Sequence, residues 1–333
     1  MTDLDCTIQH FLLHRAALND FDCEPITGDA SFRQYWRVST PSSQYVLMVS
    51  NPALVDPTPF IELNQAFQLS GLRVPNIVAK DLSLGYVLLE DLGNVHLANR
   101  LNEPNRIEHY KALIDLLPLV AKTPNHPAMR PYNDDFVAME MGIFKEWLVE
   151  KMLGVEMSAS QQTAWNELVN WIVQEFNAQP KVTMHRDFHS RNVMSIDNDW
   201  AIIDYQDAVQ GPLCYDLVSL LRDCYVKLPD NELGTLLNYG FETMQKANVA
   251  GTLTFDAFSR AFDITGMQRH LKAAGIFCRL YLRDGKAGYL ANIIPTLQYI
   301  LDISKKFQHS QWLESWLEHD IIPAMVNKLG EIR

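Results

Sequence analysis

Residues 181–207, KVTMHRDFHSRNVMSIDNDWAIIDYQD, combine short apolar runs with acid, amide and imidazole side chains. Residues 194–196 and 200–203 are mainly apolar and are separated by the turn-forming residues 197–199, so they predict a β-hairpin. Asp187 and Asn192 precede this hairpin, and Asp204 directly follows its second strand. The rest of the chain is interpreted around this hairpin.

The spacing H-x-D-x-x-x-x-N, formed by His185, Asp187 and Asn192, is followed by Asp204 at 17 residues beyond Asp187. This pattern resembles the catalytic loop and the metal-binding aspartate of protein kinases and their relatives. The resemblance implies that Asp187 is the catalytic base and that Asn192 and Asp204 hold Mg²⁺.

During phosphoryl transfer, negative charge spreads over the γ-phosphate oxygens. The site therefore needs hard oxygen ligands that hold Mg²⁺ and one carboxylate that orients the attacking hydroxyl. Asp204 is an anionic ligand, and Asn192 supplies a neutral oxygen. Two other interpretations stay open at this point. Residues 185–189 could form a turn whose side chains cap neighbouring backbone groups, or His185, Asp187 and His189 could bind a transition metal.

Composition describes an enzyme-sized chain of 333 residues with room for two lobes, and 47% of its residues are hydrophobic. The net charge of −12 argues against nucleic acid as a partner. Five scattered cysteines without a CxxC pair indicate reduced thiols. The N-terminus lacks a signal-peptide pattern, and no apolar run reaches the length of a membrane span. We expect a cytoplasmic monomer without a membrane or nucleic-acid partner.

The first part of the chain predicts a β-rich lobe. Strands are expected at residues 34–39, 45–49, 76–79 and 86–89, after a helix within residues 4–18. The loop at 28–31, from Gly28 to Ser31, is either an ordinary turn or a loop whose backbone N–H groups bind nucleotide phosphates. Glu90 and Leu92 follow the last strand, where a two-lobed kinase would have its adenine-binding hinge.

The remainder of the chain is helical in pattern, with apolar faces at residues 107–120, 139–152 and 161–178. In the second of these segments, Glu140 is either a solvated acid or a substrate contact. Asp216 begins an apolar helix for which it is a plausible N-cap.

Two motifs, HRDFHSRN at 185–192 and IDYQDAVQGPLCYDL at 203–217, resemble the signature of the aminoglycoside phosphotransferase family. Three further segments, GDASFRQYWR (28–37), LLEDLG (88–93) and RHLKAAGIFCRLYLRDGKAGYL (269–290), are similar to its branch of N-acetylmuramate and N-acetylglucosamine anomeric kinases.

This resemblance implies an α+β, bilobal protein-kinase-like fold, with a nucleotide-binding lobe at 1–92 and a catalytic, substrate-binding lobe at 93–333. It implies ATP and Mg²⁺ as cofactors, a sugar substrate and a role in recycling cell-wall sugars. Asp216, with His185 and His189, would support the catalytic loop.

One position departs from the kinase pattern. The third strand of a kinase carries a lysine for the α- and β-phosphates, but this chain has Met48 there. We expect Arg33 to supply the charge, with Arg37 as the alternative. Two other possibilities stay open: metal and backbone alone hold the nucleotide, or the chain is catalytically inactive.

Five cations recur on one predicted helix face: Arg269, Lys272, Arg279, Arg283 and Lys286. This stripe is either a solvated, ion-paired surface or part of an acceptor site for an anionic sugar, with Arg279 and Arg283 as substrate contacts. Alternative functions are a kinase of another hydroxylated metabolite, such as an aminoglycoside, choline or homoserine, and a nucleotide-binding regulatory protein without turnover.

Overall fold

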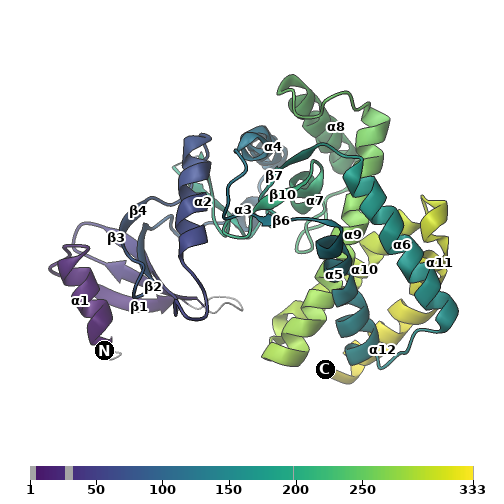
Figure 1. Ribbon diagram of the computed structural model, residues 1–333, viewed down its shortest axis with the longest axis horizontal. Helices are drawn as coiled ribbons and strands as arrows, with labels where there is room; N and C mark the ends of the chain where they lie inside the picture. Colours follow the sequence, from purple (N-terminus) through teal and green to yellow (C-terminus); the bar gives the residue numbers. More distant parts are fainter. Residues whose placement is uncertain (1–4, 27–32, 198, 333) are drawn as a thin grey trace. The chain divides into compact units, whose positions relative to one another are not determined.

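The structure is a computed structural model that describes residues 5–26, 33–197 and 199–332. Gly28 and Ser31 therefore lie outside the described residues. The chain forms two compact units (Figure 1). The first unit comprises Met1–Arg100, His126–Met129 and Arg191–Ala208, and the second comprises Leu101–Asn125, Arg130–Ser190 and Val209–Arg333. The lobe boundary expected at residue 92 stays a prediction.

The first unit contains a five-stranded antiparallel sheet in the order β1-β2-β3-β5-β4. Its strands are β1 (Asp22–Ile26), β2 (Gln34–Ser39), β3 (Gln44–Val49), β4 (Ile77–Asp81) and β5 (Tyr86–Glu90). Helix α1 (Cys6–His14) packs against one face, where Phe11 and Leu12 join Leu47 and Leu88 in a buried cluster. Successive strand residues alternate between faces, so Met48, next to Leu47, lies on the opposite face.

Helix α2 (Thr58–Leu69), helix α3 (Leu97–Arg100) and the hairpin of β8 (Val193–Ile196) and β9 (Asp199–Ile202) complete the first unit. Tyr205, after the hairpin, stacks on Phe60 of α2, and its hydroxyl accepts a hydrogen bond from Asn64 Nδ2 at 2.7 Å. Ile202 N also donates to Arg73 O at 2.8 Å. These contacts fix the hairpin to the sheet-bearing unit.

The second unit is mainly helical and contains one small sheet, β6-β10-β7. The sheet strands are β6 (Arg130–Pro131), β7 (Lys181–Met184) and β10 (Val209–Pro212). Its α-helices are α4 (Arg106–Lys122), α5 (Asp134–Ile143), α6 (Ala159–Asn177), α7 (Tyr215–Leu221), α8 (Asp230–Lys246), α9 (Phe255–Asp284), α10 (Ile293–Ser304), α11 (Gln311–Trp316) and α12 (Ile322–Ile332). Tighter or wider helical segments are η1 (Phe144–Met152), η2 (Ala287–Asn292), η3 (Gln308–Ser310) and η4 (Leu317–Ile321).

Helix α9 is the central element of the second unit and contacts α5, α6, α7, α10 and η1 (Figure 1). All residues from Ala261 to Leu271 are buried, including several polar ones. A Cβ atom at Gly275 would lie 2.4 Å from Ile143 O, so glycine is needed for this close approach of α9 to the α5–η1 junction. The inner part of α9 therefore lies in the core.

Most predicted elements occur where the sequence placed them. The segment expected as one helix at 139–152 is instead α5 followed by the π-helix η1. The strands β1, β6, β7 and β10 were not predicted. All five cysteines are free thiols, as expected.

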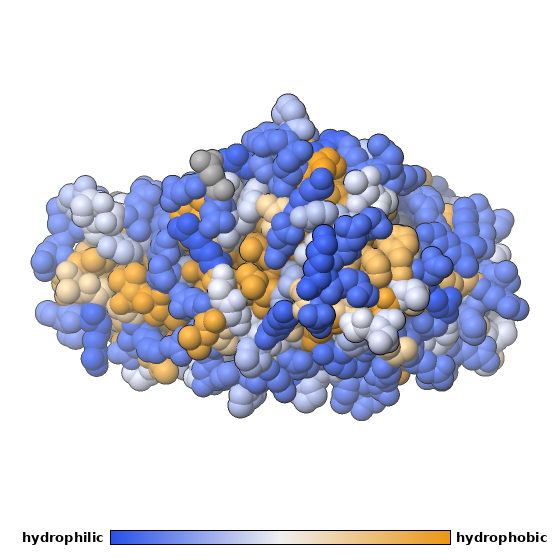
Figure 2. Space-filling view, turned by 90° about the horizontal axis from the view of Figure 1, so that it is seen from above, coloured by the Kyte–Doolittle hydropathy of each residue, from blue (hydrophilic) through white to orange (hydrophobic). Residues whose placement is uncertain are grey.

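The surface is mainly hydrophilic on the face drawn in Figure 2, with hydrophobic residues gathered in small groups. Among the described residues, none of the helices combines the length and apolar character that a membrane span needs.

Candidate active site

Asn192 and Asp204 lie together in the first unit, at the open end of the β8–β9 hairpin. Asn192 precedes β8, and Asp204 follows β9. Ile203 N donates to Asn192 O at 3.0 Å, which brings the two chain segments side by side. Asn192 Nδ2 lies 3.3 Å from Asp204 Oδ2, and Gln206 Nε2 donates to Asp204 Oδ1 at 2.6 Å. Asp204 has a positive φ of 65°, a backbone conformation that is uncommon outside glycine and typical of functional sites.

This pair is suited to Mg²⁺, which binds one or two protein oxygens and completes its shell with water and nucleotide phosphates. The described residues contain no group of three or more His, Cys, Asp or Glu side chains that could hold a metal. The alternative in which His185, Asp187 and His189 bind a transition metal is therefore not supported.

The predicted hinge follows β5 in the first unit. Glu90 Oε2 accepts hydrogen bonds from Asn76 N at 3.1 Å and from Asn76 Nδ2 at 2.8 Å. Leu92 is buried against Met194 and Ala201 of the hairpin. An apolar surface beside a backbone segment is what an adenine ring requires, and this role of Glu90 and Leu92 stays a prediction.

Met48 is fully buried on β3, opposite Tyr35 of β2. Burial raises the pKa of Tyr35 to about 12, and Arg33 and Asp204 lie close enough to shift this pKa in opposite directions. Arg33 and the predicted metal ligand Asp204 thus both act on Tyr35, the residue that pairs with Met48 across the two strands. Arg37 is engaged elsewhere, since its Nε donates to Asp91 Oδ2 at 2.6 Å and its Nη2 to Asn94 Oδ1 at 2.7 Å.

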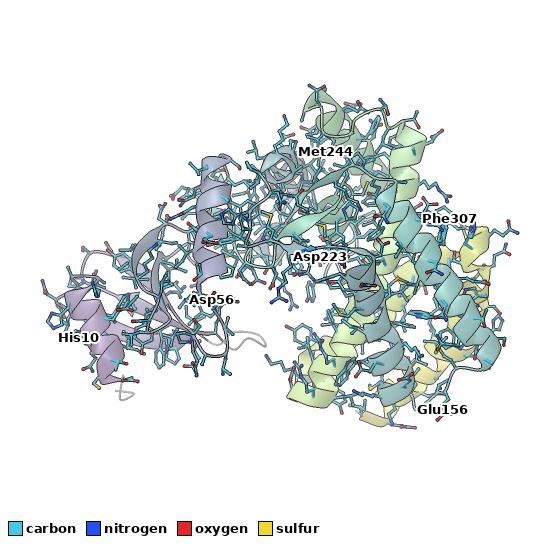
Figure 3. All side chains as sticks on the ribbon, in the orientation of Figure 1. His10, Asp56, Glu156, Asp223, Met244 and Phe307 are labelled. Atoms are coloured by element: carbon cyan, nitrogen blue, oxygen red, sulfur yellow. The ribbon has the colours of Figure 1, made fainter. Side chains whose placement is uncertain are left out.

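The segment from His185 to Ser190 lies in the second unit and is held by two aspartates. Asp216 accepts hydrogen bonds from His185 N at 2.7 Å and Arg186 N at 2.9 Å. Asp223, labelled in Figure 3, accepts from Ser190 N at 2.9 Å. Asp216 is not the N-cap expected from the sequence, because α7 begins at Tyr215 and the carboxylate of Asp216 points to the loop instead. These contacts are those of a loop support.

The two predicted histidines of this segment differ. His185 is buried, packs edge-on against Phe188 and accepts from Asp187 N at 3.3 Å through Nδ1. His189 packs edge-on against Tyr225 and lies close enough to Asp187 to favour its ionised form. Burial raises the pKa of Asp216 to about 6, against the effect of His185 and the two backbone donors.

Asp187 is surrounded by cations. Burial alone would raise the pKa of Asp187, but Lys272, His189, Arg186 and Arg269 hold it well below its usual range. Asp187 is therefore ionised at neutral pH. An ionised carboxylate can accept the hydrogen of an incoming hydroxyl and orient its oxygen for attack.

Glu140 lies beneath this group and is 2% exposed. Its Oε1 pairs with Arg186 Nη2 and, at 3.1 Å, with Lys272 Nζ. Its Oε2 accepts from Tyr132 OH at 2.8 Å and from Gln268 Nε2 at 3.0 Å. Both oxygens of Glu140 are engaged, so Glu140 supports Arg186 and Lys272, and a substrate contact by Glu140 stays a prediction. The solvated-acid alternative is wrong.

The cationic stripe has two different halves. Arg269 and Lys272 are buried near Asp187, so they are neither solvated nor on the surface. Arg279 is half-buried, and Arg283 is exposed and donates to Asp284 Oδ1 at 2.7 Å. Lys286 lies beyond the helix, which ends at Asp284 with Gly285 in the left-handed conformation. Substrate contacts by Arg279 and Arg283 stay predictions.

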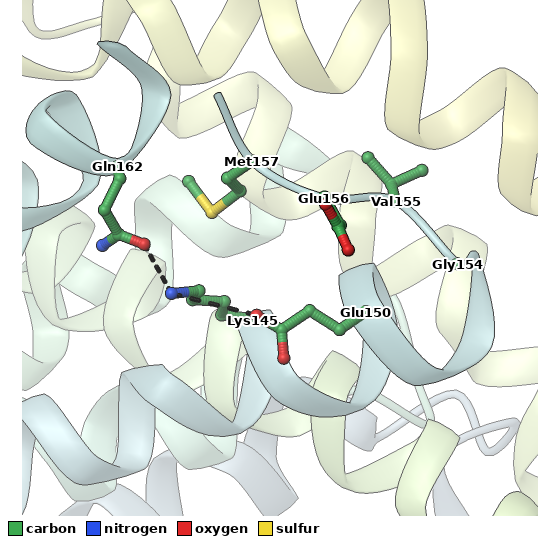
Figure 4. A pocket seen from close by; sticks show the side chains of 7 residues that line it. All are labelled: Lys145, Glu150, Gly154, Val155, Glu156, Met157 and Gln162. Atoms are coloured by element: carbon green, nitrogen blue, oxygen red, sulfur yellow. Dashed lines mark hydrogen bonds and ion pairs between the residues drawn. The ribbon is translucent and has the colours of Figure 1, made fainter. Parts of the chain in front are cut away.

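An open pocket occurs at the end of η1, away from these residues in sequence (Figure 4). Lys145 Nζ donates to Gln162 Oε1 at 2.5 Å and lies 3.8 Å from Glu150 Oε1. No predicted site residue lines it, and its cation is already paired. We assign it no function.

Sequence reasoning did not assign Lys272, Arg269 or Asp223 to the catalytic loop. The sequence signal was weak, because Met267, Leu271 and Ala274 flank Arg269 and Lys272, but the polar residues Gln268 and His270 lie in the same run. Charged residues are buried mainly where they are paired, and pairing is not visible in the sequence.

The fold and the loop geometry together define a kinase-like phosphotransferase, and comparisons agree. The solved structures of choline kinase LicA from Streptococcus pneumoniae (TM-score 0.63, 11% identity, 89% of this chain and 98% of that one) and of an ADP-bound aminoglycoside phosphotransferase (TM-score 0.61, 13% identity, 90% and 99%) share the fold. Residues 22–249 match the phosphotransferase enzyme family, APH. The chain belongs to this family and is a small-molecule kinase. This confirms the family and fold expected from the sequence.

More similar relatives share a single name. An N-acetylmuramate/N-acetylglucosamine kinase from Neisseria meningitidis serogroup B is 35% identical over 293 residues, covering 86% of this chain and 87% of that protein. The protein of the same name from Pseudomonas putida is 33% identical over 277 residues, covering 83% and 82%.

Proposed function

We propose that this chain transfers the γ-phosphoryl group of ATP to the anomeric hydroxyl of an N-acetylated amino sugar, N-acetylmuramate or N-acetylglucosamine. The relatives that carry these sugars in their name support the substrate class. The observation that carries the chemistry is Asp187, ionised and held among Lys272, Arg186 and Arg269 on a loop fixed by two aspartates.

Asn192 and Asp204 would hold Mg²⁺, whose charge would neutralise the nucleotide phosphates, and Arg33 would add positive charge. Asp187 accepts a hydrogen bond from the acceptor hydroxyl and orients it. A carboxylate with a depressed pKa is a weak base, which suits an anomeric hydroxyl because that group is more acidic than an ordinary alcohol.

The test is ADP release with a panel of acceptors, including both sugars, choline, homoserine and an aminoglycoside. We expect turnover with the two sugars and a sugar 1-phosphate as the product, identified by ³¹P NMR. The methyl glycoside of N-acetylglucosamine is the matched control, since it lacks only the free anomeric hydroxyl. Equal ADP release with the methyl glycoside would exclude transfer to C1, and turnover with choline or homoserine alone would replace the sugar.

The structure gives one reason to prefer the sugars over a cationic acceptor. The cationic side chains of Arg186, Arg269 and Lys272 lower the pKa of Asp187. A positively charged acceptor would therefore meet like charge beside Asp187. A role in cell-wall sugar recycling and a cytoplasmic location, where ATP is available, follow as parts of this proposal.

A further inference from the structure

The outer half of α9 carries a cation whose charge is available to a ligand. Arg279 is half-buried, and its Nε is shielded from solvent without a hydrogen-bond partner among the described residues. Burial and the neighbouring Arg283 lower the pKa of Arg279, while the nearby acids Asp284 and Glu146 oppose this. Each acid has another cation as its partner, since Asp284 pairs with Arg283 and Glu146 with Lys151.

Arg279 lies on the same side of α9 as the residues around Asp187. It follows Lys272 by seven residues, or about two turns and ~10 Å along the axis. Side chains on a helix lean toward its N-terminus, so Arg279 extends back toward Lys272. The α5–η1 segment runs along this side of α9. Residues of the two segments lie close to each other in three successive pairs: Glu140 with Lys272, Ile143 with Gly275, and Glu146 with Arg279.

The two sugars of the proposed function differ in one charged group. N-acetylmuramate carries a lactyl ether, ending in a carboxylate, on the oxygen at C3, and N-acetylglucosamine has a hydroxyl there. With the C1 hydroxyl at Asp187, the carboxylate would lie several ångströms away from Asp187. A cation that recognises this carboxylate must therefore lie several ångströms from Asp187, away from the reacting hydroxyl.

We propose that Arg279 binds the carboxylate of an acidic amino sugar and thereby sets the preference for N-acetylmuramate over N-acetylglucosamine. This inference rests on the proposed function. The planar guanidinium matches a carboxylate with two parallel hydrogen bonds. The other cations of the stripe are less suitable: Lys272 is engaged by Glu140, Arg269 is buried, and Arg283 is exposed and paired with Asp284.

The experiment compares kcat/KM for both sugars in the unaltered chain, Arg279→Gln and Arg283→Gln. Arg283→Gln removes the same charge one turn further along the helix and also tests the other predicted contact, which we infer to be absent because Arg283 is exposed and paired with Asp284. We expect Arg279→Gln to lower kcat/KM for N-acetylmuramate by roughly tenfold or more, mainly through KM, and to leave N-acetylglucosamine within about twofold. Arg283→Gln should leave the ratio of the two values unchanged.

A second comparison changes the ligand instead of the protein. The methyl ester of N-acetylmuramate keeps the size of the lactyl group but has no charge, so its kcat/KM should be insensitive to Arg279→Gln. Arg279→Lys keeps the positive charge but not the planar guanidinium, so it should retain part of the preference for N-acetylmuramate. Thermal unfolding of each variant verifies folding.

Two failures are distinguishable. If the unaltered chain phosphorylates neither sugar, the proposed function itself is wrong. If it phosphorylates both and Arg279→Gln affects them equally, or Arg283→Gln changes the ratio as strongly, the assignment of Arg279 is overturned while the kinase function stands.

Discussion

Glu140 in α5 and Lys272 in α9 form a buried ion pair, with 3.1 Å between Oε1 and Nζ. Lys272 is 8% exposed and also donates to Tyr215 OH at 3.1 Å. The same lysine is the strongest of the charges that keep Asp187 ionised. The Lys272 side chain thus connects the buried carboxylate of Glu140 with the predicted catalytic base, Asp187.

Lys272→Met should lower kcat by about 100-fold, since it removes the main compensating charge from Asp187. The KM for ATP should change little, because the predicted nucleotide residues belong to the first unit. Breaking a buried pair from one side also destabilises a protein by about 3–5 kcal/mol. Steady-state kinetics and urea unfolding measure both effects. Lys272→Arg should recover much of kcat, and recovery of stability without recovery of kcat would contradict a role for the charge at Asp187.

Asp187→Asn should lower turnover by about 10²–10⁴-fold while nucleotide affinity stays within about twofold. The amide keeps the shape of the side chain but cannot accept the acceptor's proton. Single-turnover kinetics and calorimetric titration with ATP give the two quantities. Turnover at the unaltered rate would mean that Asp187 is not the base.

Asp204→Ala should weaken Mg²⁺-dependent nucleotide binding as well as turnover, because it removes the anionic ligand beside Asn192. Titration with ATP in the presence and absence of Mg²⁺ measures this dependence. A Mg²⁺ effect as large as in the unaltered chain would show that the ion is held elsewhere.

Arg33→Gln should raise the KM for ATP by roughly tenfold, since Arg33 and Asp204 both act on Tyr35, which lies opposite the buried Met48. Arg37→Gln, on the strand β2 that follows Arg33, is the control, because Arg37 is paired with Asp91. An unchanged KM and kcat in Arg33→Gln would remove Arg33 from the phosphate site.

The free energy of unfolding should decrease as the pH is lowered below 6.5, in part because of His270. Burial, and then Arg269, lower the pKa of His270 to about 3 from 6.5, so the unfolded chain binds this proton more tightly. The native state is then fully favoured above pH 6.5 and loses about 1.4 kcal/mol per pH unit between 6.5 and about 3. His270→Gln should remove this slope. A constant difference in unfolding free energy between the two proteins from pH 7 to pH 5 would contradict the expectation.

The sequence predicted the elements that depend on neighbouring residues. The strand at 34–39 and the hairpin around residue 198 follow from alternation and turn chemistry, both of which are local. The spacing of Asp187, Asn192 and Asp204 indicated a kinase-like protein, and the two motifs at 185–192 and 203–217 identified the family, because both are short-range patterns.

The contacts beneath the loop were not predictable in the same way. Glu140, Arg186 and Lys272 are separated by 46 and 86 residues in the chain, and only tertiary packing makes one carboxylate the partner of both cations. Periodicity placed Arg269, Lys272 and Arg279 on one helix face. It could not show that the first two lie in the core, since that depends on what covers the helix.

The close approach at Gly275 has a consequence for how α9 is positioned along its axis. A long helix packed through side chains alone can slip by a turn against its neighbour and find equivalent grooves. Here the backbone of the α5–η1 junction occupies the place of a missing side chain. A slip of one turn would bring Leu271 or Arg279 to this place, and neither side chain would fit there. The helix therefore has a single axial register, which fixes the position of both Lys272 and Arg279 along α5 and η1. If Arg279 binds the acceptor as proposed, this register limits the length of the acceptor molecule.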